Sequence, residues 1–403
     1  MTTTDRILLL GCGTPTVHGR DQIRRAAAQA AARGITLVGA DTPENLRRLE
    51  PGVLPETVAF DAEDVEATRA WVEGRTDFGA VVTFRELCVE SAAVAAAALG
   101  LAGNPIEVVR TMRNKDRCRA ALRRAGMRQP EFAAVSGAAQ AAEFLARTGP
   151  GPWVMKPTDG MGSVGVSLVE NEADLARAFE AVGSAGPALL ETFVQGPEYS
   201  AEGVLVEGRP VLLGITAKTT DVGFVETGHR MPARLDVSVE QEAEREVVRA
   251  LLAVGATHGI FHVEFWVTES GVVLGELHAR PGGDFIHLLV EETRPGLELF
   301  GTLFDDVLGR PAAEPAKQTR AAGVDFLTFP SGIVRSVSGW PEAVAGPAVR
   351  GAGLFIEPGR EIGKITCSSD RHGVIAVSGE DDEAVESALR EVRGLIKVVV
   401  EQS

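Results

Sequence analysis

The segments 261–267 (FHVEFWV) and 272–278 (VVLGELH) decide the expected fold of this 403-residue chain. Each alternates apolar and polar side chains, which is typical of a half-buried strand. The three residues between Thr268 and Val272 (ESG) end in glycine, as a type I turn with a bulge requires. This loop predicts an antiparallel hairpin in which Thr268 lies opposite Val272. The side chains expected to face the core are Val263, Phe265, Val273 and Leu277.

In the same register Glu264 lies opposite Glu276, on the polar face of the hairpin. Like charges that face each other repel, so this pair needs a cation between its members. Paired carboxylates, with water and phosphate oxygens, are what Mg²⁺ prefers, and His278 lies on the same face. A two-residue loop would shift the register by one and leave the two glutamates on opposite faces. The three-residue loop therefore predicts a metal site at Glu264, Glu276 and His278.

The residues that follow the hairpin, 280–284 (RPGGD), have the character of an anion site. Arg280 lies where a cation can hold a transferring phosphoryl group. Gly282 and Gly283 lead into a helix with Asp284 as its N-cap, and backbone N–H groups at such a place bind anions. We therefore expect Arg280, Gly282 and Gly283 to take part in catalysis.

A glycine-rich segment, 156–166 (KPTDGMGSVGV), joins two predicted strands at 153–156 and 165–169. Its backbone N–H groups can approach phosphate oxygens closely, because glycines carry no side chain. Lys156 at the end of the first strand supplies a cation for the same phosphates. A mobile turn with a solvated lysine fits this segment equally well.

The segment 191–200 (ETFVQGPEYS) contains a Gly-Pro turn between two predicted strands. Free backbone groups of residues 192–194 can read an adenine edge, and Glu198 can accept hydrogen bonds from ribose hydroxyls. Carboxylates on the surface beside a turn would show the same pattern, so the neighbouring motifs are needed to choose between the two interpretations.

The first hundred residues alternate strand and helix signals, which predicts a parallel sheet of βαβ units. The strands are expected at Arg6–Leu10, 35–39 and Ala80–Thr83, and the helices at 21–33, 65–73 and Val89–Leu99. Gly11 and Gly13 follow the first strand, but Thr16 stands where a dinucleotide fingerprint has its third glycine. With Asp41 as the ribose carboxylate, an NAD-dependent dehydrogenase is the resulting alternative. We favour a tight first turn of a Rossmann-like sheet.

From residue 108 onward the regular alternation of strand and helix signals ends. We expect helices and strands in an α+β arrangement, then a Pro/Ala linker and a small β-rich unit from Thr319. The expected helices are 109–126, 138–147, 239–258, 285–308 and 383–395, and further strands are Phe132–Val135, 188–194, 198–207, 209–217 and 396–400.

Charge and composition limit the partners. Forty Lys and Arg against 56 Asp and Glu give a net charge of −16, which disfavours nucleic acid and anionic membrane as partners. No stretch reaches the ~20 apolar residues of a membrane span, and the N-terminal residues lack a signal-peptide pattern. We expect a cytoplasmic protein that acts on small molecules. No CxxC pair occurs, so structural zinc is not expected at the four cysteines, Cys12, Cys88, Cys118 and Cys367.

Taken in order, these pieces resemble the ATP-grasp ligases over essentially the whole chain. The resemblance implies a Rossmann-like pre-ATP-grasp domain at 1–108, a lid lobe at 109–194, a large lobe at 195–318 and a C-terminal α+β subdomain at 319–403. It also implies ATP with Mg²⁺, or with Mn²⁺ as the alternative metal. The residues that it assigns to ATP are Lys115, Lys156, Gly162, Ser163, Val164, Glu191, Thr192, Phe193, Val194 and Glu198.

Within that superfamily the chain is most similar to the L-amino-acid ligases, which are dipeptide synthases. The resemblance implies that a substrate carboxylate attacks the γ-phosphate of ATP, and that an amine then displaces phosphate from the acyl phosphate. Glu86 and Glu226 would bind a substrate ammonium, and His229 would orient it or act as a base. A polar loop between strands is the alternative for residues 226–232. The residues assigned to substrate are Glu86, Lys218, Glu226, His229 and Asp284.

One departure from the family pattern concerns His278, which stands where the usual E-x-N motif has asparagine. Imidazole is a poor Mg²⁺ ligand, so His278 has substrate contact or orientation of Glu276 as alternative roles. Other functions left open are a purine-pathway or biotin-carboxylase-like enzyme and a catalytically silent ATP-binding regulator. The first should show more basic residues near the N-terminal glycine turn than Arg20, Arg24 and Arg25. A homodimer also stays open.

Overall fold

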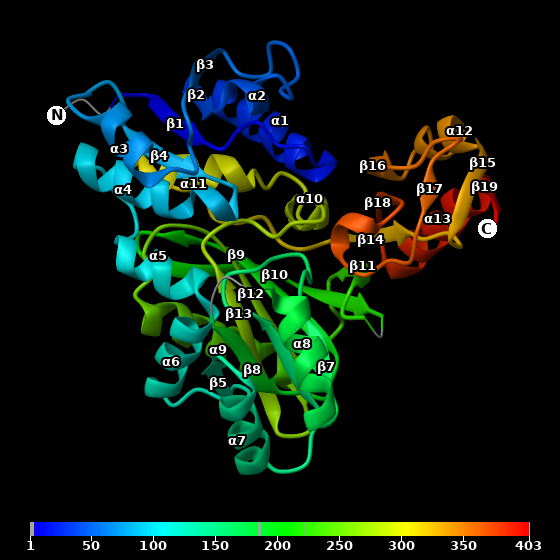
Figure 1. The fold of residues 1–403 in the computed structure, drawn as a ribbon. Coiled ribbons are helices and arrows are strands. Elements are labelled where there is room, and N and C mark those ends of the chain that lie inside the picture. Colours follow the sequence, from blue (N-terminus) through cyan, green and yellow to red (C-terminus); the bar gives the residue numbers. More distant parts are fainter. Residues whose placement is uncertain (1–3, 184–186, 222, 403) are drawn as a thin grey trace.

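The N-terminal region forms a parallel sheet covered by helices, as the alternating pattern predicts. The computed structural model describes residues 4–183, 187–221 and 223–402. The sheet order is β3-β2-β1-β4, and this unit lies at the top of Figure 1. Its elements are β1 (Arg6–Leu10), α1 (Val17–Ala32), β2 (Thr36–Asp41), α2 (Pro43–Leu46), β3 (Glu56–Ala59), α3 (Val65–Val72), β4 (Ala80–Thr83), the 3₁₀ turn η1 (Glu86–Cys88) and α4 (Val89–Leu99).

Two short helices, α5 (Ile106–Arg113) and α6 (Lys115–Arg124), replace the single helix expected at 109–126. The prediction of one helix is wrong because Asn114 adopts an extended conformation, with φ −93° and ψ 113°. The N–H of Lys115 then donates to the carbonyl of Thr158 at 2.9 Å. The break therefore ties Lys115 to the start of the glycine-rich segment.

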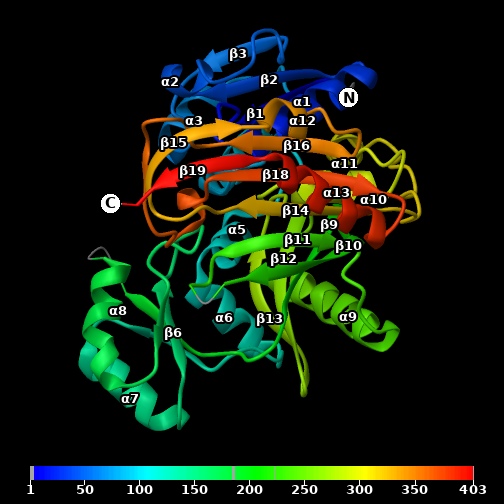
Figure 2. The same ribbon diagram turned by 90° about the vertical axis from the view of Figure 1, so that its right-hand side faces the viewer.

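A four-stranded antiparallel sheet in the order β5-β8-β6-β7 forms a lobe with two helices packed on it. Figure 2 shows this lobe set apart from the long central sheet, at the lower left. Its elements are β5 (Phe132–Val135), α7 (Ala138–Thr148), β6 (Trp153–Pro157), β7 (Ser167–Val169), η2 (Glu172–Asp174), α8 (Leu175–Val182) and β8 (Ala188–Thr192).

An eight-stranded sheet in the order β13-β12-β9-β10-β11-β14-β18-β16 runs through the centre of the molecule (Figure 2). Its first five strands and their helix are β9 (Glu198–Val206), β10 (Arg209–Thr220), β11 (Glu226–Met231), α9 (Val237–Val254), β12 (Gly259–Thr268) and β13 (Gly271–His278). Residues 226–231 thus form a strand, so the polar-loop alternative for this segment is wrong.

The C-terminal region does not form a sheet of its own at residue 319, because three of its strands extend the central sheet. β14 pairs with β11, and β18 and β16 follow. The remaining three strands form a small sheet in the order β17-β15-β19. The elements are β14 (Ala321–Leu327), β15 (Gly332–Ser338), α12 (Trp340–Val344), β16 (Val349–Leu354), β17 (Glu361–Ile362), η3 (Ser368–Asp370), β18 (Gly373–Gly379), α13 (Asp382–Leu395) and β19 (Lys397–Glu401).

Two helices, α10 (Ile286–Thr293) and α11 (Leu299–Val307), stand where one helix was expected at 285–308. That prediction is wrong because Pro295 cannot continue a helix and Gly296 adopts φ +89°. Phe300 and Phe304 of α11 pack in one core with Ile7 and Leu9 of β1. The two helices therefore join the N-terminal unit to the central sheet.

The hairpin β12–β13 differs from the expected one in its loop. Thr268 pairs with Gly271, so the loop has two residues and the predicted pairing of Thr268 with Val272 is wrong. The register then shifts between Val263 and Phe265, because Gly275 and Glu276 both lie opposite Glu264. This β-bulge returns Glu276 to the face of Glu264.

The same bulge corrects the expected core. Val272 and Leu274 pack in the core beside Phe265, whereas Val273 does not belong to that cluster. Leu277, which follows the bulge, packs there as predicted. The two glutamates are therefore neighbours through the bulge at Gly275 rather than through the turn at Gly271.

We predict that Gly275→Ala destabilises the protein by about 1–3 kcal/mol, the usual cost of overpacking a filled site. A Cβ at this position would lie 2.8 Å from the carbonyl oxygen and 3.1 Å from the Cβ of Glu264. The measurement is the free energy of unfolding in a denaturant titration. Gly394→Ala is the control, since a Cβ there meets nothing within 4 Å in α13. An unchanged stability of Gly275→Ala would contradict the bulge.

Candidate functional site

Three side chains on β12 and β13 meet on the polar face of the central sheet. The ligand atoms of Glu264, Glu276 and His278 lie within 4.8 Å of one another, and the three side chains are half-buried. The bulge described above produces this arrangement. The sequence prediction that these residues come together agrees with the structure.

Two lysines, one from α6 and one from β6, neutralise the charge of the Glu276 carboxylate. Lys115 Nζ lies 3.2 Å from Glu276 Oε2, and Lys156 Nζ lies 3.0 Å from Glu276 Oε1. Burial alone would raise the pKa of Glu276, but the two ammonium groups lower it to about 2. The lysines come from α6 and β6, so the predicted phosphate-binding cations converge on a predicted metal ligand.

Lys156 contacts a buried ion pair, Arg119–Glu191, that was not predicted from the sequence. Its Nζ lies 2.9 Å from Glu191 Oε2, and Arg119 of α6 donates to the other oxygen of Glu191. Arg119 is buried and also donates to the carbonyls of Leu274 and Gly275 at 2.7 and 3.0 Å. Glu191 therefore supports Lys156 and, through Arg119, is linked to the bulge.

Lys218 of β10 lies among three carboxylates on the same face. Its Nζ pairs with Glu198, lies 2.8 Å from Glu264 Oε1 and lies 3.5 Å from Glu226 Oε1. Burial would lower the pKa of Lys218, but these charges hold it well above its usual value. The carboxylate expected to bind ribose, Glu198, is thus paired with Lys218.

A second buried pair, Glu202 of β9 and His262 of β12, was also missed. His262 Nδ1 lies 2.9 Å from Glu202 Oε2, and its Nε2 lies 3.4 Å from Glu264 Oε1. Burial lowers the pKa of His262, but the charge and hydrogen bond of Glu202 outweigh burial and raise it to about 9. Period 2 along each strand could have placed Glu202 with Glu198, and His262 with Glu264.

Glu86 reaches the site from the N-terminal unit. Its Oε2 accepts a hydrogen bond from Arg280 Nε at 2.7 Å and lies 3.1 Å from His278 Nδ1. Burial opposes ionisation of this carboxyl, but Arg280 and then His278 hold its pKa well below its usual range. Arg280 and His278, the two partners of Glu86, are therefore both predicted site residues.

The far end of the site contains Asp284, Glu226 and Arg371, a C-terminal arginine that the sequence analysis missed. Arg371 donates to Asp284 Oδ2 at 2.7 Å and to Glu226 Oε2 at 2.6 Å. His229 Nε2 and His18 Nδ1 each lie 3.8 Å from an oxygen of Asp284. No local motif marks Arg371, because its partners are distant in the sequence.

Gly282 and Gly283 lie between Arg280 and this cluster. Gln22 of α1 donates to the carbonyl oxygen of Gly282 at 3.3 Å. A Cβ on Gly282 would lie 2.9 Å from Ile286 and 3.1 Å from His262 Nδ1. The backbone therefore passes closely between α10 and the sheet, as an unsubstituted residue allows.

The glycine-rich segment covers one side of the lysine pair. Lys115 Nζ donates to the carbonyl of Gly160 at 2.6 Å, and Ser163 Oγ donates to the carbonyl of Phe224 at 2.8 Å. Ser163 has φ +62° and Gly162 has φ +65°. Val164 points outward and is 57% exposed. The segment is thus anchored at Lys115 and Ser163, with its tip open to solvent.

The segment predicted to meet adenine follows β8. The N–H groups of Thr192 and Phe193 donate to the carbonyls of Glu131 and Pro152 at 2.9 and 3.0 Å. These two N–H groups are therefore already hydrogen-bonded to backbone carbonyls of the same lobe. Among residues 4–183, 187–221 and 223–402, the Val194 N–H has no such partner, and Phe193 lies beside Phe224 with ring centroids 6.3 Å apart.

The N-terminal glycine turn has a different role from dinucleotide binding. Asp41 is fully buried, and its Oδ2 accepts a hydrogen bond from the N–H of Gly13 at 2.9 Å. Asn45 and the N–H of Thr42 donate to its other oxygen. The carboxylate that NAD binding would require is thus already used to hold the turn.

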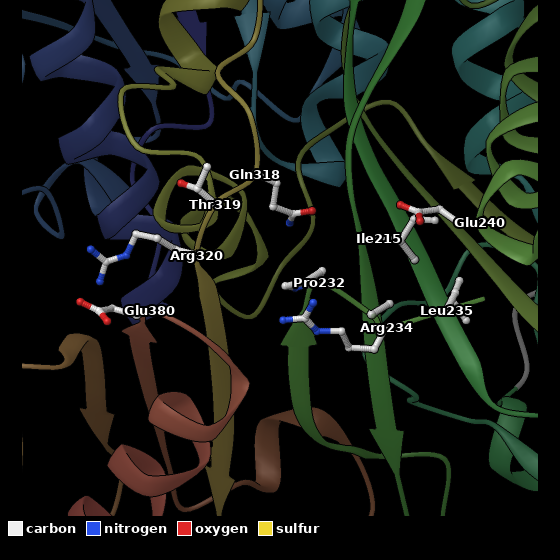
Figure 3. A pocket seen from close by; sticks show the side chains of 10 residues that line it. Ile215, Pro232, Arg234, Leu235, Glu240, Gln318, Thr319, Arg320 and Glu380 are labelled. Carbon is white, nitrogen blue, oxygen red and sulfur yellow. The ribbon is translucent and has the colours of Figure 1, made fainter. Parts of the chain in front are cut away.

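A separate hollow of about 360 Å³ lies beside Ile215 in the middle of β10 and the residues that follow β11. Figure 3 shows Gln318, Thr319 and Arg320 on one side of it and Pro232, Arg234 and Leu235 on the other. Arg234 is paired with Asp382. None of the carboxylate–lysine pairs described above lines this hollow.

Comparisons with known proteins agree with this geometry. The ATP-grasp domain family matches residues 150–287, and the L-amino acid ligase C-terminal domain 2 family matches residues 325–401. The alanine–anticapsin ligase of Bacillus subtilis is 30% identical over 214 residues, 47% of this chain and 44% of that protein. Carnosine synthase 1 of Gallus gallus is 31% identical over 284 residues, 63% of this chain and 30% of that protein. The chain spans less than half the length of these two relatives.

Several solved structures share this fold. The crystal structure of an L-amino acid ligase from Bacillus licheniformis aligns over 100% of both chains, with a TM-score of 0.82 and 23% identity. Purine-pathway and biotin carboxylase structures share the fold at lower TM-scores, from 0.71 to 0.76. In the described part of the chain, no helix is long and apolar enough to cross a membrane. The chain therefore contains an ATP-grasp domain at residues 150–287 and the C-terminal domain 2 of the L-amino acid ligases at residues 325–401.

Proposed function

We propose that this protein is an ATP-dependent ligase that joins the carboxylate of an amino acid to an amine and releases ADP and phosphate. The observation that carries the proposal is the convergence of Lys115, Lys156, Glu264 and Glu276 on one face of the sheet. Arg280 and Glu86 continue that face. The ligase relatives support the same reaction class. We place the enzyme in the cytoplasm, with small-molecule acids and amines as substrates.

The donor set fits a hard divalent cation at Glu264 and Glu276. Two carboxylates within 4.8 Å of each other suit Mg²⁺, which keeps several waters and binds phosphate oxygens; Mn²⁺ is the alternative. Such a cation, when bound with ATP, would neutralise charge on the phosphates. His278 is already engaged with Glu86, so we assign it to orientation of the site rather than to the metal.

The nucleotide is proposed to lie between the lid and the sheet. Lys115 and Lys156 would exchange Glu276 for phosphate oxygens, and the loop N–H groups of Gly162 to Val164 would approach the same phosphates. The open Val194 N–H and the Thr192 carbonyl would meet adenine. Glu198 would accept the ribose hydroxyls.

The reaction would proceed beside Arg280. The substrate carboxylate attacks the γ-phosphorus, the bond to the ADP oxygen breaks, and an acyl phosphate forms. The amine then attacks the acyl carbon, loses a proton, and expels phosphate to leave the amide. Arg280 and the N–H groups of Gly282 and Gly283 would stabilise the negative charge that develops in these steps.

The alternatives within the fold have weaker support. Purine-pathway and biotin carboxylase structures are the more distant neighbours, and the C-terminal domain matches the L-amino acid ligases. An NAD-dependent dehydrogenase is disfavoured because Asp41 is used to hold the glycine turn. A silent ATP-binding regulator would not need the retained lysine, glutamate and arginine set.

We predict that phosphate release requires ATP, a divalent metal, an amino acid and an amine together. The measurement is a screen of amino-acid pairs with ATP and Mg²⁺, read by phosphate release and product mass. Chelation of the metal should stop phosphate release, and added Mg²⁺ should restore it. Phosphate release that does not depend on any amine tested would count against the ligase.

We predict that Glu276→Gln lowers the rate of ADP formation by about 100-fold or more, since loss of a metal ligand removes several kcal/mol of charge stabilisation. Glutamine keeps the shape of the side chain but removes the charge that pairs with Lys115 and Lys156, so the thermal unfolding midpoint should fall, and turnover is compared at a temperature at which both proteins are folded. Glu240→Gln, in α9 and exposed, is the matched control and should turn over normally. Parent-like turnover by Glu276→Gln would overturn the metal assignment.

A further inference from the structure

Arg371 belongs to a short segment of the C-terminal region that enters the site from outside the ATP-grasp lobes. It follows η3 and precedes β18. The residue is 4% exposed, and its guanidinium lies over the ring of Phe326 at 3.6 Å from the centroid. A buried arginine needs anionic partners, and this one has two.

The partners of Arg371 are the two acids at the far end of the site. Nη1 donates to Asp284 at 2.7 Å, and Nη2 donates to Glu226 at 2.6 Å. Asp284 follows the Arg280 segment, and Glu226 begins β11. The planar guanidinium presents one N–H group to each carboxylate in a fixed geometry, so it sets the position of the two acids relative to each other.

The same segment makes two further contacts. Ser368 Oγ donates to Glu226 Oε2 at 3.3 Å, and the N–H of Ser368 donates to the carbonyl of Gly162 at 3.1 Å. Residues 368–371 therefore contact both the glycine-rich segment 156–166 and the two acids. Without them, Glu226 would keep Lys218 at 3.5 Å as its nearest cation.

The acids retain capacity for another cation. Asp284 Oδ1 accepts no hydrogen bond from the described residues; the imidazole of His18 lies 3.8 Å away, and burial lowers the pKa of that ring to about 4. His229, 1% exposed, has both ring nitrogens without a hydrogen-bond partner in the same described part of the chain. Its Nε2 lies 3.8 Å from Asp284 Oδ2. Arg371 and Lys218 are the cations beside these two acids, and Lys218 also pairs with Glu198 and Glu264, so negative charge is left for an ammonium group.

We propose that Arg371 is a positioning residue of the ligase site, which holds Glu226 and Asp284 so that they receive the ammonium group of an amino-acid substrate. The C-terminal region thereby becomes part of the amino-acid site rather than a cover for the sheet. This inference rests on the proposed function, because it assigns one substrate group to that same site.

The test compares Arg371→Lys and Arg371→Ala with the parent protein in full-length form. With ATP and Mg²⁺ present, binding of each standard protein amino acid is measured by calorimetry. The amino acid that binds is then compared with its analogue lacking the amino group. KM values for ATP and for the amino acid, kcat and the thermal midpoint are measured in parallel. Arg393→Ala is the control, since Arg393 also pairs with a C-terminal acid, Asp325, at 2.9 Å.

We expect Arg371→Lys to keep its fold and its KM for ATP within about twofold, because lysine retains the charge. Its affinity for the amino acid should fall by about 10–100-fold, the usual effect of misplacing a binding group by about 1 Å. The preference for the amino acid over its analogue should shrink by the same factor. Arg371→Ala should lose more affinity, and Arg393→Ala should match the parent.

Several results would overturn the inference. Unchanged amino-acid affinity in Arg371→Lys would do so while leaving the ligase proposal standing. An equal rise in the KM for ATP, or the same loss in Arg393→Ala, would show a merely structural role. No amino-acid binding by the parent protein would overturn both proposals together.

Discussion

The ion pairs of Glu276 with Lys115 and Lys156 are the interaction on which the arrangement of this site depends. A carboxylate and two ammonium groups removed from water are costly unless they meet one another closely. Glu276 belongs to β13 of the central sheet, Lys115 begins α6, and Lys156 belongs to β6 of the four-stranded sheet. Their distances of 3.2 and 3.0 Å therefore hold three parts of the chain together. A nucleotide with its metal would offer each charge a new partner, since phosphates suit the lysines and a cation suits the glutamate.

Several local irregularities of the backbone bring these charged side chains together. The bulge at Gly275 brings Glu276 beside Glu264. The break at Asn114 turns Lys115 toward the glycine-rich segment. Arg119 and Glu191 form a buried pair beneath Lys156 and join it to the carbonyls of the bulge. Each feature departs from a regular helix or strand at a place where a charged side chain must be aimed, which is where irregular backbone is commonly found.

The sequence was sufficient for much of the fold but not for these irregularities. Strands such as Arg6–Leu10 and Ala80–Thr83 follow directly from short apolar runs, and the structure has them at the predicted bounds. The loop at 269–271 suggested a three-residue turn, whereas the structure has a two-residue turn and a bulge. Both errors in register cancel at Glu276, so the carboxylate pair was predicted correctly by a wrong route. Local pattern does not reveal the bulge, because the tight space at Gly275, where a Cβ would lie 2.8 Å from the carbonyl oxygen of Glu264, involves a residue of the partner strand.

The predicted site residues divide in the same way. Residues two positions apart on one strand, such as Glu276 and His278, could be placed on one face from period 2 alone. Arg371 could not, since its two partners are distant in the sequence and no spacing rule connects them. Glu202 and His262 lay within reach of the same periodicity. Buried counter-ions are chosen by the charges they neutralise, and these become visible only when the strands are brought together.

The most direct measurement is an experimental structure of the full chain with Mg²⁺ and a non-hydrolysable ATP analogue. We expect the cation between the carboxylates of Glu264 and Glu276, with Lys115 and Lys156 moved from Glu276 to phosphate oxygens. A nucleotide bound elsewhere, or lysines that stay on Glu276 while the phosphates lie apart from them, would contradict it.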